Sequence, residues 1–228
     1  MQPIATFSIV AYDPRRDEWG VAVQSKFLAA AAVVSWARAG AGAVATQAHA
    51  NLTYGPRGLD LMAAGLTATE MVDVVTRDDP DRAQRQMGAV DTAGRAAAFT
   101  GEACLDWAGH VVGDGYACQG KILVPGTVEA MAERYEAVRG HEGELADWLV
   151  EALAAGQAAG GDRRGRQAAG VLVVRRQGGY GGNNDRYLDL LMIRAFETTE
   201  PTTRAPQSWM SHQGGRLAAR GPEGRRRH

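Results

Sequence analysis

Several arginines stand in turns where their side chains could contact a substrate. Residues 160–167 form a loop with three arginines and one acid, and Arg163 or Arg166 could bind a carboxylate or phosphate group. Arg57 lies in a turn that leads into a predicted helix and could clamp a carboxylate in the same way. The alternatives are an exposed loop paired with its own acid, and an Arg57 that only caps and solvates its helix.

A second set of candidates lies among glycines and turn residues. His110 and Asp114 belong to the glycine-rich stretch 107–115, and such stretches can bring backbone N–H groups to an anion. Asn184 and Asp185 precede the last predicted strand. They are turn residues by composition, and they could form one wall of a site by position.

The residue spacing predicts neither a metal nor an organic cofactor. There is no His-x-x-x-His pattern and no paired-cysteine motif, since Cys104 and Cys118 stand far apart. The lone glycine pairs match neither a dinucleotide-binding motif nor a P-loop. Two cysteines also make a disulfide framework unnecessary, which favours a reducing compartment.

Composition limits the partners and the location. The net charge of −1 provides no field that would recruit nucleic acid or an anionic membrane. Residues 1–5 are too short and too uncharged for a signal peptide, and no apolar run is long enough to span a bilayer. We therefore expect a cytoplasmic protein that acts on a small-molecule substrate, without nucleic acid or membrane as a partner.

The hydrophobic pattern predicts strands and helices in alternating groups. We expect strands over 6–12, 19–25, 33–39, 42–47, 86–91, 96–100, 116–124, 169–175 and 187–193. We expect helices over 58–65, 67–76, 127–138 and 145–155, with Thr67 and Glu70 as a capping box. This order suits antiparallel sheets with helices packed outside, in one domain over 1–197. Residues 198–228 lack an apolar period and are predicted to be a disordered tail.

Eight ordered blocks of the sequence carry a resemblance to a known family. They are TFSIVA (6–11), GVAVQSKFLA (20–29), WARAGAGAVATQA (36–48), YGPRGLDL (54–61), AAFTG (97–101), WAGHVVGDGYACQG (107–120), AGQAAGGDRRGRQAA (155–169) and GGYGGNNDRYLDL (178–190). Together they resemble domain-of-unknown-function family 1028, which is regarded as Ntn-hydrolase-like. The resemblance implies an α+β fold, a four-layer αββα sandwich of two antiparallel sheets flanked by helices.

The resemblance also implies a catalytic position. In such folds the first residue of the first strand is the nucleophile, and its own free α-amine is the base. An α-amine titrates at about 8, so it can accept the hydroxyl proton at neutral pH. The matching position is Thr6, which would have to become N-terminal by removal of residues 1–5. The alternative is that residues 1–5 remain and Thr6 is simply a β-forming residue.

Other residues would complete such a site. Ser25 and Lys26 end the second strand of the opening hairpin, which returns them to the level of Thr6. A lysine there could depress the pKa of the amine and stabilise charge, or it could be an ordinary exposed lysine. The side chains of three residues at the end of the fourth strand or just after it could donate hydrogen bonds to an oxyanion: Gln47, His49 and Asn51.

Lys121 departs from the family pattern, because asparagine commonly stands at this position. If that asparagine donates to an oxyanion, a lysine could still stabilise the charge, but with a different reach and pKa. The departure, together with residues 1–5, favours functions that do not need an N-terminal nucleophile.

Three functions therefore remain open. The first is an amide-bond hydrolase or acyl-transfer enzyme that uses Thr6. The second is an enzyme on the same fold with an acid and a base drawn from Lys26, His49, His110 and Asp114. The third is a ligand-binding protein without turnover. Trp19, Trp36 and Trp107 exceed what one small core needs at such positions, so we also expect a homo-oligomer.

Overall fold

Ten strands in two antiparallel sheets and five α-helices make up the computed structural model, which describes residues 6–193. The strands are β1 (Thr6–Asp13), β2 (Glu18–Ser25), β3 (Ser35–Arg38), β4 (Gly42–Ala48), β5 (Arg85–Asp91), β6 (Ala96–Thr100), β7 (Ala108–Gly113), β8 (Tyr116–Lys121), β9 (Ala168–Val174) and β10 (Arg186–Ile193). The α-helices are α1 (Ala30–Val34), α2 (Tyr54–Ala63), α3 (Ala68–Arg77), α4 (Thr127–Val138) and α5 (Leu145–Ala158). The predicted tail from residue 198 and the segment 1–5 lie outside the described residues.

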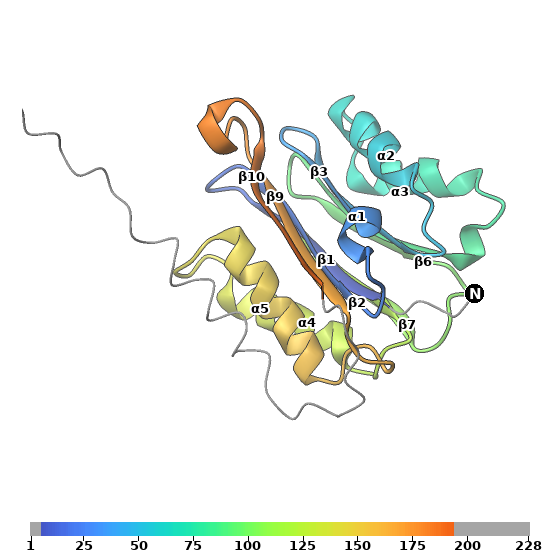
Figure 1. The fold of residues 1–228 in the computed structure, drawn as a ribbon. Helices are drawn as coiled ribbons and strands as arrows, with labels where there is room; N and C mark the ends of the chain where they lie inside the picture. Colours follow the sequence, from blue (N-terminus) through green and yellow to red (C-terminus); the bar gives the residue numbers. More distant parts are fainter. Residues whose placement is uncertain (1–5, 194–228) are drawn as a thin grey trace, which may run out of the picture. The chain divides into compact units, whose positions relative to one another are not determined.

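The two sheets differ in size. The larger sheet has six strands in the order β10-β9-β2-β1-β8-β7, and the smaller sheet has four in the order β3-β4-β5-β6. Figure 1 shows the two sheets face to face, with α4 and α5 on the outer side of the larger sheet. Helices α2 and α3 lie on the outer side of the smaller sheet (Figure 1). Central strands are therefore covered on both faces, which explains why β1 and β2 are apolar at most positions.

Three hydrophobic clusters fill the spaces between these elements. Phe7 and Ile9 on β1 pack against α4 and α5, while Val10 on the opposite face of the strand packs toward the smaller sheet. This alternation follows from the period of two in a strand. A third cluster, which includes Met71 of α3 and Met87 of β5, joins the smaller sheet to its helices. Within residues 6–193 no helix is long and apolar enough to cross a membrane.

Most predicted elements are confirmed. The opening hairpin pairs Thr6 with Ser25, and Thr67 forms a capping box with Glu70 at the start of α3. Helix α2 begins at Tyr54, earlier than predicted, because a proline at position 56 is tolerated in the first turn, where no N–H partner is needed. The strand predicted over 33–39 is wrong at its start, because residues 33 and 34 end the short helix α1. This helix was not predicted, since its five residues are too few to show a helical period.

The glycine-rich stretch 107–115 was interpreted wrongly as an anion-binding loop. Most of it is strand β7, which pairs with β8 along its whole length. Glycine at 109 leaves room for the Trp107 ring, because a Cβ there would lie 2.8 Å from that ring. Strand β7 lies at the edge of the larger sheet, and those of its backbone N–H groups that face β8 are paired within the sheet.

The three tryptophans do not support the predicted oligomer, because each packs within the described chain. Trp19 is 1% exposed, stacks on Tyr12 with ring centroids 4.9 Å apart and donates to the carbonyl of Asp91. Trp36 and Trp107 are half-buried against two of the hydrophobic clusters. The homo-oligomer stays a prediction, and light scattering at micromolar concentration would test it.

Candidate functional site

The space between the two sheets changes from apolar to polar along the strands. At the end where β1 terminates, it is filled by apolar side chains such as Val10, Val21 and Val90. At the end where β1 begins, the buried side chains are polar: Thr6, Ser8, Ser25, Gln47, Gln86, Gln119 and Lys121. Burying polar groups costs free energy unless each finds a partner. Because so many buried polar side chains gather there, we take the Thr6 end of the space between the sheets as the candidate site.

Thr6 lies at the centre of this polar end. It is the first residue of β1, and it faces Ser25 on β2 and Lys121 on β8 in register. The hydroxyl oxygens of Thr6 and Ser25 are 3.1 Å apart, so one donates a hydrogen bond to the other. All three residues are at most 3% exposed. The Thr6 hydroxyl thus has a second hydroxyl on one neighbouring strand, and a lysine stands at the paired position of the other.

Lys121 is a buried cation. Burial lowers its pKa, because the charged form loses hydration, and Arg164 acts in the same direction. Among residues 6–193, no acceptor receives a hydrogen bond from its ammonium group. The strand ends directly after it, where Ile122 adopts a φ of 56°, in a region that a β-branched residue rarely occupies. Strain of this kind tends to accumulate at functional sites.

Cys104 is a further nucleophilic group near Lys121. Burial raises the pKa of its thiol, while the charge of Lys121 acts in the opposite direction. The thiol donates to the carbonyl of Arg85 at 3.3 Å. The net effect of burial keeps this thiol protonated, so it contributes less to nucleophilic chemistry than a hydroxyl with an adjacent base.

A chain of buried side chains connects the two sheets beside Thr6. Gln119 donates to the Ser8 hydroxyl at 2.6 Å, and Ser8 donates to Oε1 of Gln47 at 2.7 Å. Nε2 of Gln47 lies 3.3 Å from the carbonyl oxygen of Thr6 and 2.8 Å from Oε1 of Gln86. These contacts hold the start of β1 in place relative to the smaller sheet.

The same chain continues to the surface. Gln86 donates to the hydroxyl of Thr100 at 3.0 Å, and that hydroxyl is 2.8 Å from Nδ1 of the exposed His110. One acceptor of the chain, Oε1 of Gln119, is buried and has no partner among the described residues. A buried acceptor without a donor costs about 1–3 kcal/mol, so this layer is optimised for something other than stability alone.

The arginine-rich loop lies at the same end of the larger sheet. The side chain of Asp162 is fully buried, accepts from the backbone N of Lys26 at 3.1 Å and pairs with Arg164 at 2.9 Å. Arg163 is exposed and donates to the carbonyl of Leu123 at 2.8 Å. The loop is therefore tied to the ends of β2 and β8, next to Ser25 and Lys121 along the chain.

Two residues predicted to donate to an oxyanion have other partners. The amide of Asn51 donates to Asp79 at 2.9 Å and its oxygen accepts from Thr53, so it organises the turn into α2. The Nε2 group of Gln47 already faces three acceptors, which are the Thr6 carbonyl, Gln86 and the Gln119 carbonyl. Neither amide is available to a substrate without breaking these contacts.

His49 and Arg57 are exposed and stand away from the buried polar layer. His49 follows β4, and its carbonyl accepts a hydrogen bond from Arg85. Arg57 lies on α2, which covers the outer face of the smaller sheet. Neither side chain has a described contact with Thr6.

Three predicted site residues lie at the opposite end of the larger sheet. Asp114 follows β7, where the strands have reached the level of Ala11, about 17 Å along β1 from Thr6. Asn184 and Asp185 belong to the β9–β10 turn, and each accepts a hydrogen bond from a nearby backbone N. These three residues do not share a site with Thr6, because antiparallel neighbours place alternate turns at opposite sheet ends.

Sequence reasoning missed Gln86, Gln119 and Thr100. Each stands on a strand whose neighbours are mostly apolar, and the two glutamines are fully buried. A long amide side chain on the inward face of a predicted strand was the available signal, because such a group needs a partner across the layer.

A family model and a solved structure assign this chain to the same family. Residues 6–203 match the model of a family of unknown function, DUF1028. A similar solved structure is that of protein SPO2555 from Silicibacter pomeroyi, a DUF1028 protein, with 26% sequence identity and a TM-score of 0.76. The match covers 92% of this chain and 89% of that one. No curated protein matches the chain.

Proposed function

The chain belongs to the DUF1028 family, and we propose that it is an Ntn-hydrolase-like enzyme that cleaves the C–N bond of a small-molecule amide. The arrangement of helices and sheets in Figure 1 supports assignment to the four-layer αββα class of that superfamily. The observation that carries the proposal is the position of Thr6. Its hydroxyl begins β1, is buried, and lies 3.1 Å from that of Ser25 beside Lys121.

The proposed reaction starts once residues 1–5 have been removed. The free α-amine of Thr6 accepts the proton of the Thr6 hydroxyl while Oγ1 attacks the amide carbon. The C–N bond then breaks, the ammonium returns its proton to the leaving amine, and an ester remains on Thr6. Water hydrolyses this ester, again with the α-amine as base, and releases the acid.

Lys121 would stabilise the oxyanion in this mechanism. The candidate amides of Gln47 and Asn51 are engaged, whereas the ammonium group of Lys121 has no acceptor within residues 6–193. A cation in a buried layer interacts with a developing negative charge more strongly than it would in water. Its position beside Thr6 also disfavours protonation of the α-amine, which keeps that base available at neutral pH.

The first experiment measures the intact mass and the N-terminal sequence of the protein expressed from its native start. A chain that begins at Thr6 supports the proposal. A matched pair of chains that start at position 6, one wild type and one with Thr6→Ala, is then treated with an acylating electrophile. We expect one acyl group on the hydroxyl of Thr6 in the first chain, which the second chain cannot carry, and hydrolysis of model amides only by the first chain.

Retention of residues 1–5, together with equal amide hydrolysis by wild type and Thr6→Ala, would contradict the proposal. Turnover with residues 1–5 retained would favour acid–base chemistry on the same fold. Saturable ligand binding without turnover would favour a binding protein.

A further inference from the structure

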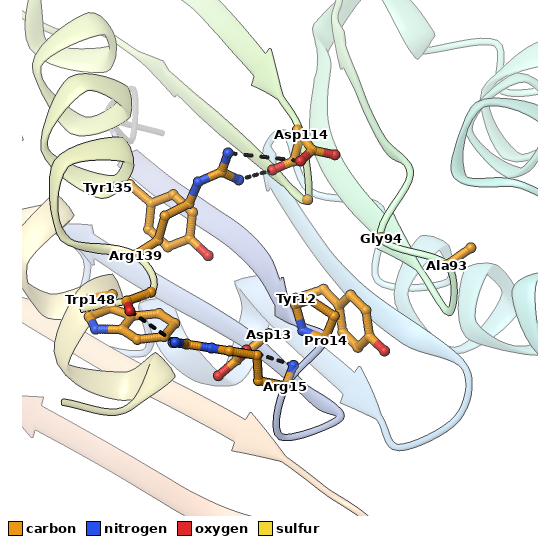
Figure 2. A pocket seen from close by; sticks show the side chains of 12 residues that line it. Tyr12, Asp13, Pro14, Arg15, Ala93, Gly94, Asp114, Tyr135, Arg139 and Trp148 are labelled. Atoms are coloured by element: carbon orange, nitrogen blue, oxygen red, sulfur yellow. Dashed lines mark hydrogen bonds and ion pairs between the residues drawn. The ribbon is translucent and has the colours of Figure 1, made fainter. Parts of the chain in front are cut away.

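A second hollow lies at the far end of β1 from Thr6. It has a volume of about 360 Å³, and three sheet turns and the ends of α4 and α5 surround it. Figure 2 shows the side chains that matter most: Tyr12, Arg15, Tyr135, Arg139 and Trp148. This volume falls in the range of small-molecule sites. The chemistry proposed for Thr6 does not use this cavity.

Tyr135 contributes a hydroxyl that faces the cavity. Its side chain is 1% exposed, and within the described residues the hydroxyl has no hydrogen-bond partner. Figure 2 shows the hydroxyl directed toward the hollow rather than into the helix. Burial raises its pKa, so the phenol stays protonated and is available as a donor. A donor without a protein partner on the wall of a cavity is available to a ligand or water that accepts from it.

Two arginines on opposite sides of the cavity are held in fixed positions. Arg15 donates to the carbonyl of Gly140 at 2.9 Å, and its guanidinium lies 5.3 Å from the Trp148 ring. Arg139 donates to the carbonyl of Asp114 and lies 5.8 Å from the Tyr116 ring. Arg15 also lies 3.6 Å from a carboxylate oxygen of Asp13. Each guanidinium has five N–H donors, so both arginines keep some donors for a ligand after their ion pairs are counted. Because backbone carbonyls and aromatic rings already order both arginine side chains, less side-chain entropy is lost when a ligand binds.

Acidic groups at the cavity are already compensated. Asp13 accepts from the backbone N of Arg15 and pairs with Arg16 at 2.9 Å. The Asp114 side chain is 96% exposed and lies 3.8 Å from Arg139. Arg139 also pairs with Glu136 at 2.7 Å, outside the lining. Each of these acids is thus paired with an arginine, and a ligand would meet the remaining N–H donors of Arg15 and Arg139 and the Tyr135 hydroxyl.

We propose that this cavity binds a small organic carboxylate. Its carboxylate would accept hydrogen bonds from Arg15, Arg139 and the Tyr135 hydroxyl, since guanidinium groups match carboxylates with two parallel bonds. The site is separate from Thr6, so binding there does not require the amide chemistry.

The test uses the full chain with phenylacetate as the probe and its neutral analogue, phenylacetamide, in titration calorimetry. We expect phenylacetate to bind, and Tyr135→Phe and Arg139→Gln each to weaken binding about tenfold, the effect of one lost hydrogen bond to a charge. Arg134→Gln is the matched control, because Arg134 is on the same helix and pairs with Glu151 outside the cavity. That variant should bind as the wild type does.

Three outcomes would overturn the proposal. They are no binding of phenylacetate at millimolar concentration, equal affinity for phenylacetamide, and unchanged affinity in both cavity variants. Tyr135→Phe removes a hydroxyl that has no protein partner, so its folding is not at risk, and thermal unfolding of each variant will verify this.

Discussion

The side-chain amide of Gln119 donates a hydrogen bond of 2.6 Å to the hydroxyl of Ser8, and both side chains are fully buried between the two sheets. Ser8 passes the interaction on to Gln47 of the smaller sheet. A single hydroxyl therefore connects β8, β1 and β4 at the level of the candidate site. Removal of the Ser8 hydroxyl should therefore weaken hydrogen bonds in both sheets.

Ser8→Ala should lower the free energy of unfolding by about 1–3 kcal/mol, because Gln47 loses a donor and Gln119 loses an acceptor in a buried layer. Urea denaturation of the wild type and the variant measures the difference in the free energy of unfolding. Ser35→Ala is the control, since the Ser35 hydroxyl is buried and has no partner among the described residues. That variant should be as stable as the wild type or slightly more so. Equal losses in both variants would contradict the role of Ser8.

Gly88→Ala should also destabilise the protein, because a Cβ there would lie 2.1 Å from Oε1 of Gln119. To relieve the clash, Gln119 would have to give up its bond to Ser8, at a cost of about 1–3 kcal/mol. A double-mutant cycle with Gln119→Ala tests this contact, and the glycine substitution should cost less in that background. Additive effects would mean that the two positions do not interact.

Asp79 should make stability depend on pH in the acid range. Burial acts to raise its pKa, but hydrogen bonds from Arg85, Asn51 and Tyr54 outweigh this and hold the pKa well below its usual range. A depressed folded-state pKa contributes stability above the ordinary pKa of about 3.9, and this is lost as the pH falls through the folded value. Asp79→Asn should therefore destabilise at pH 7 by about 1–3 kcal/mol.

The difference between wild type and Asp79→Asn should shrink as urea titrations move below about pH 4. Asp60→Asn is the matched control, because its carboxylate is 71% exposed and pairs with Arg38 on the surface. That pair should contribute less than about 1 kcal/mol. A difference for Asp79 that stays constant down to pH 2 would show that its charge is not responsible.

Lys121→Met should raise the stability at neutral pH while abolishing any amide hydrolysis. Burial lowers the pKa of Lys121, so the folded state holds this proton less firmly than the unfolded state. The charge therefore costs stability below the folded pKa, and the cost disappears as the pH rises toward the ordinary lysine value of about 10.4. Urea denaturation at pH 7 and pH 10 measures this, with Lys26→Met for comparison. A loss of stability at pH 7 would contradict the expectation.

Much of the fold followed from local patterns. The β-branched and aromatic residues of β1, the turn that follows it and the capping box at Thr67 depend on neighbours within a few residues, so they could be interpreted directly. The same hairpin predicted that Ser25 returns to Thr6. Strand β7 was missed, because its glycines are typical of loops and only pairing with β8 makes them a strand.

Most of the candidate site depended on tertiary structure. The residues opposite and across from Thr6 come from distant strands, with Lys121 on β8 and Gln47 on the other sheet. No pattern of neighbouring residues predicts either contact, because sheet order and sheet packing are set by burial over the whole chain. The sequence by itself determined the elements and the residue types that could react. Only the tertiary structure decided which of them share one buried layer, and which stand at the opposite end of the sheet.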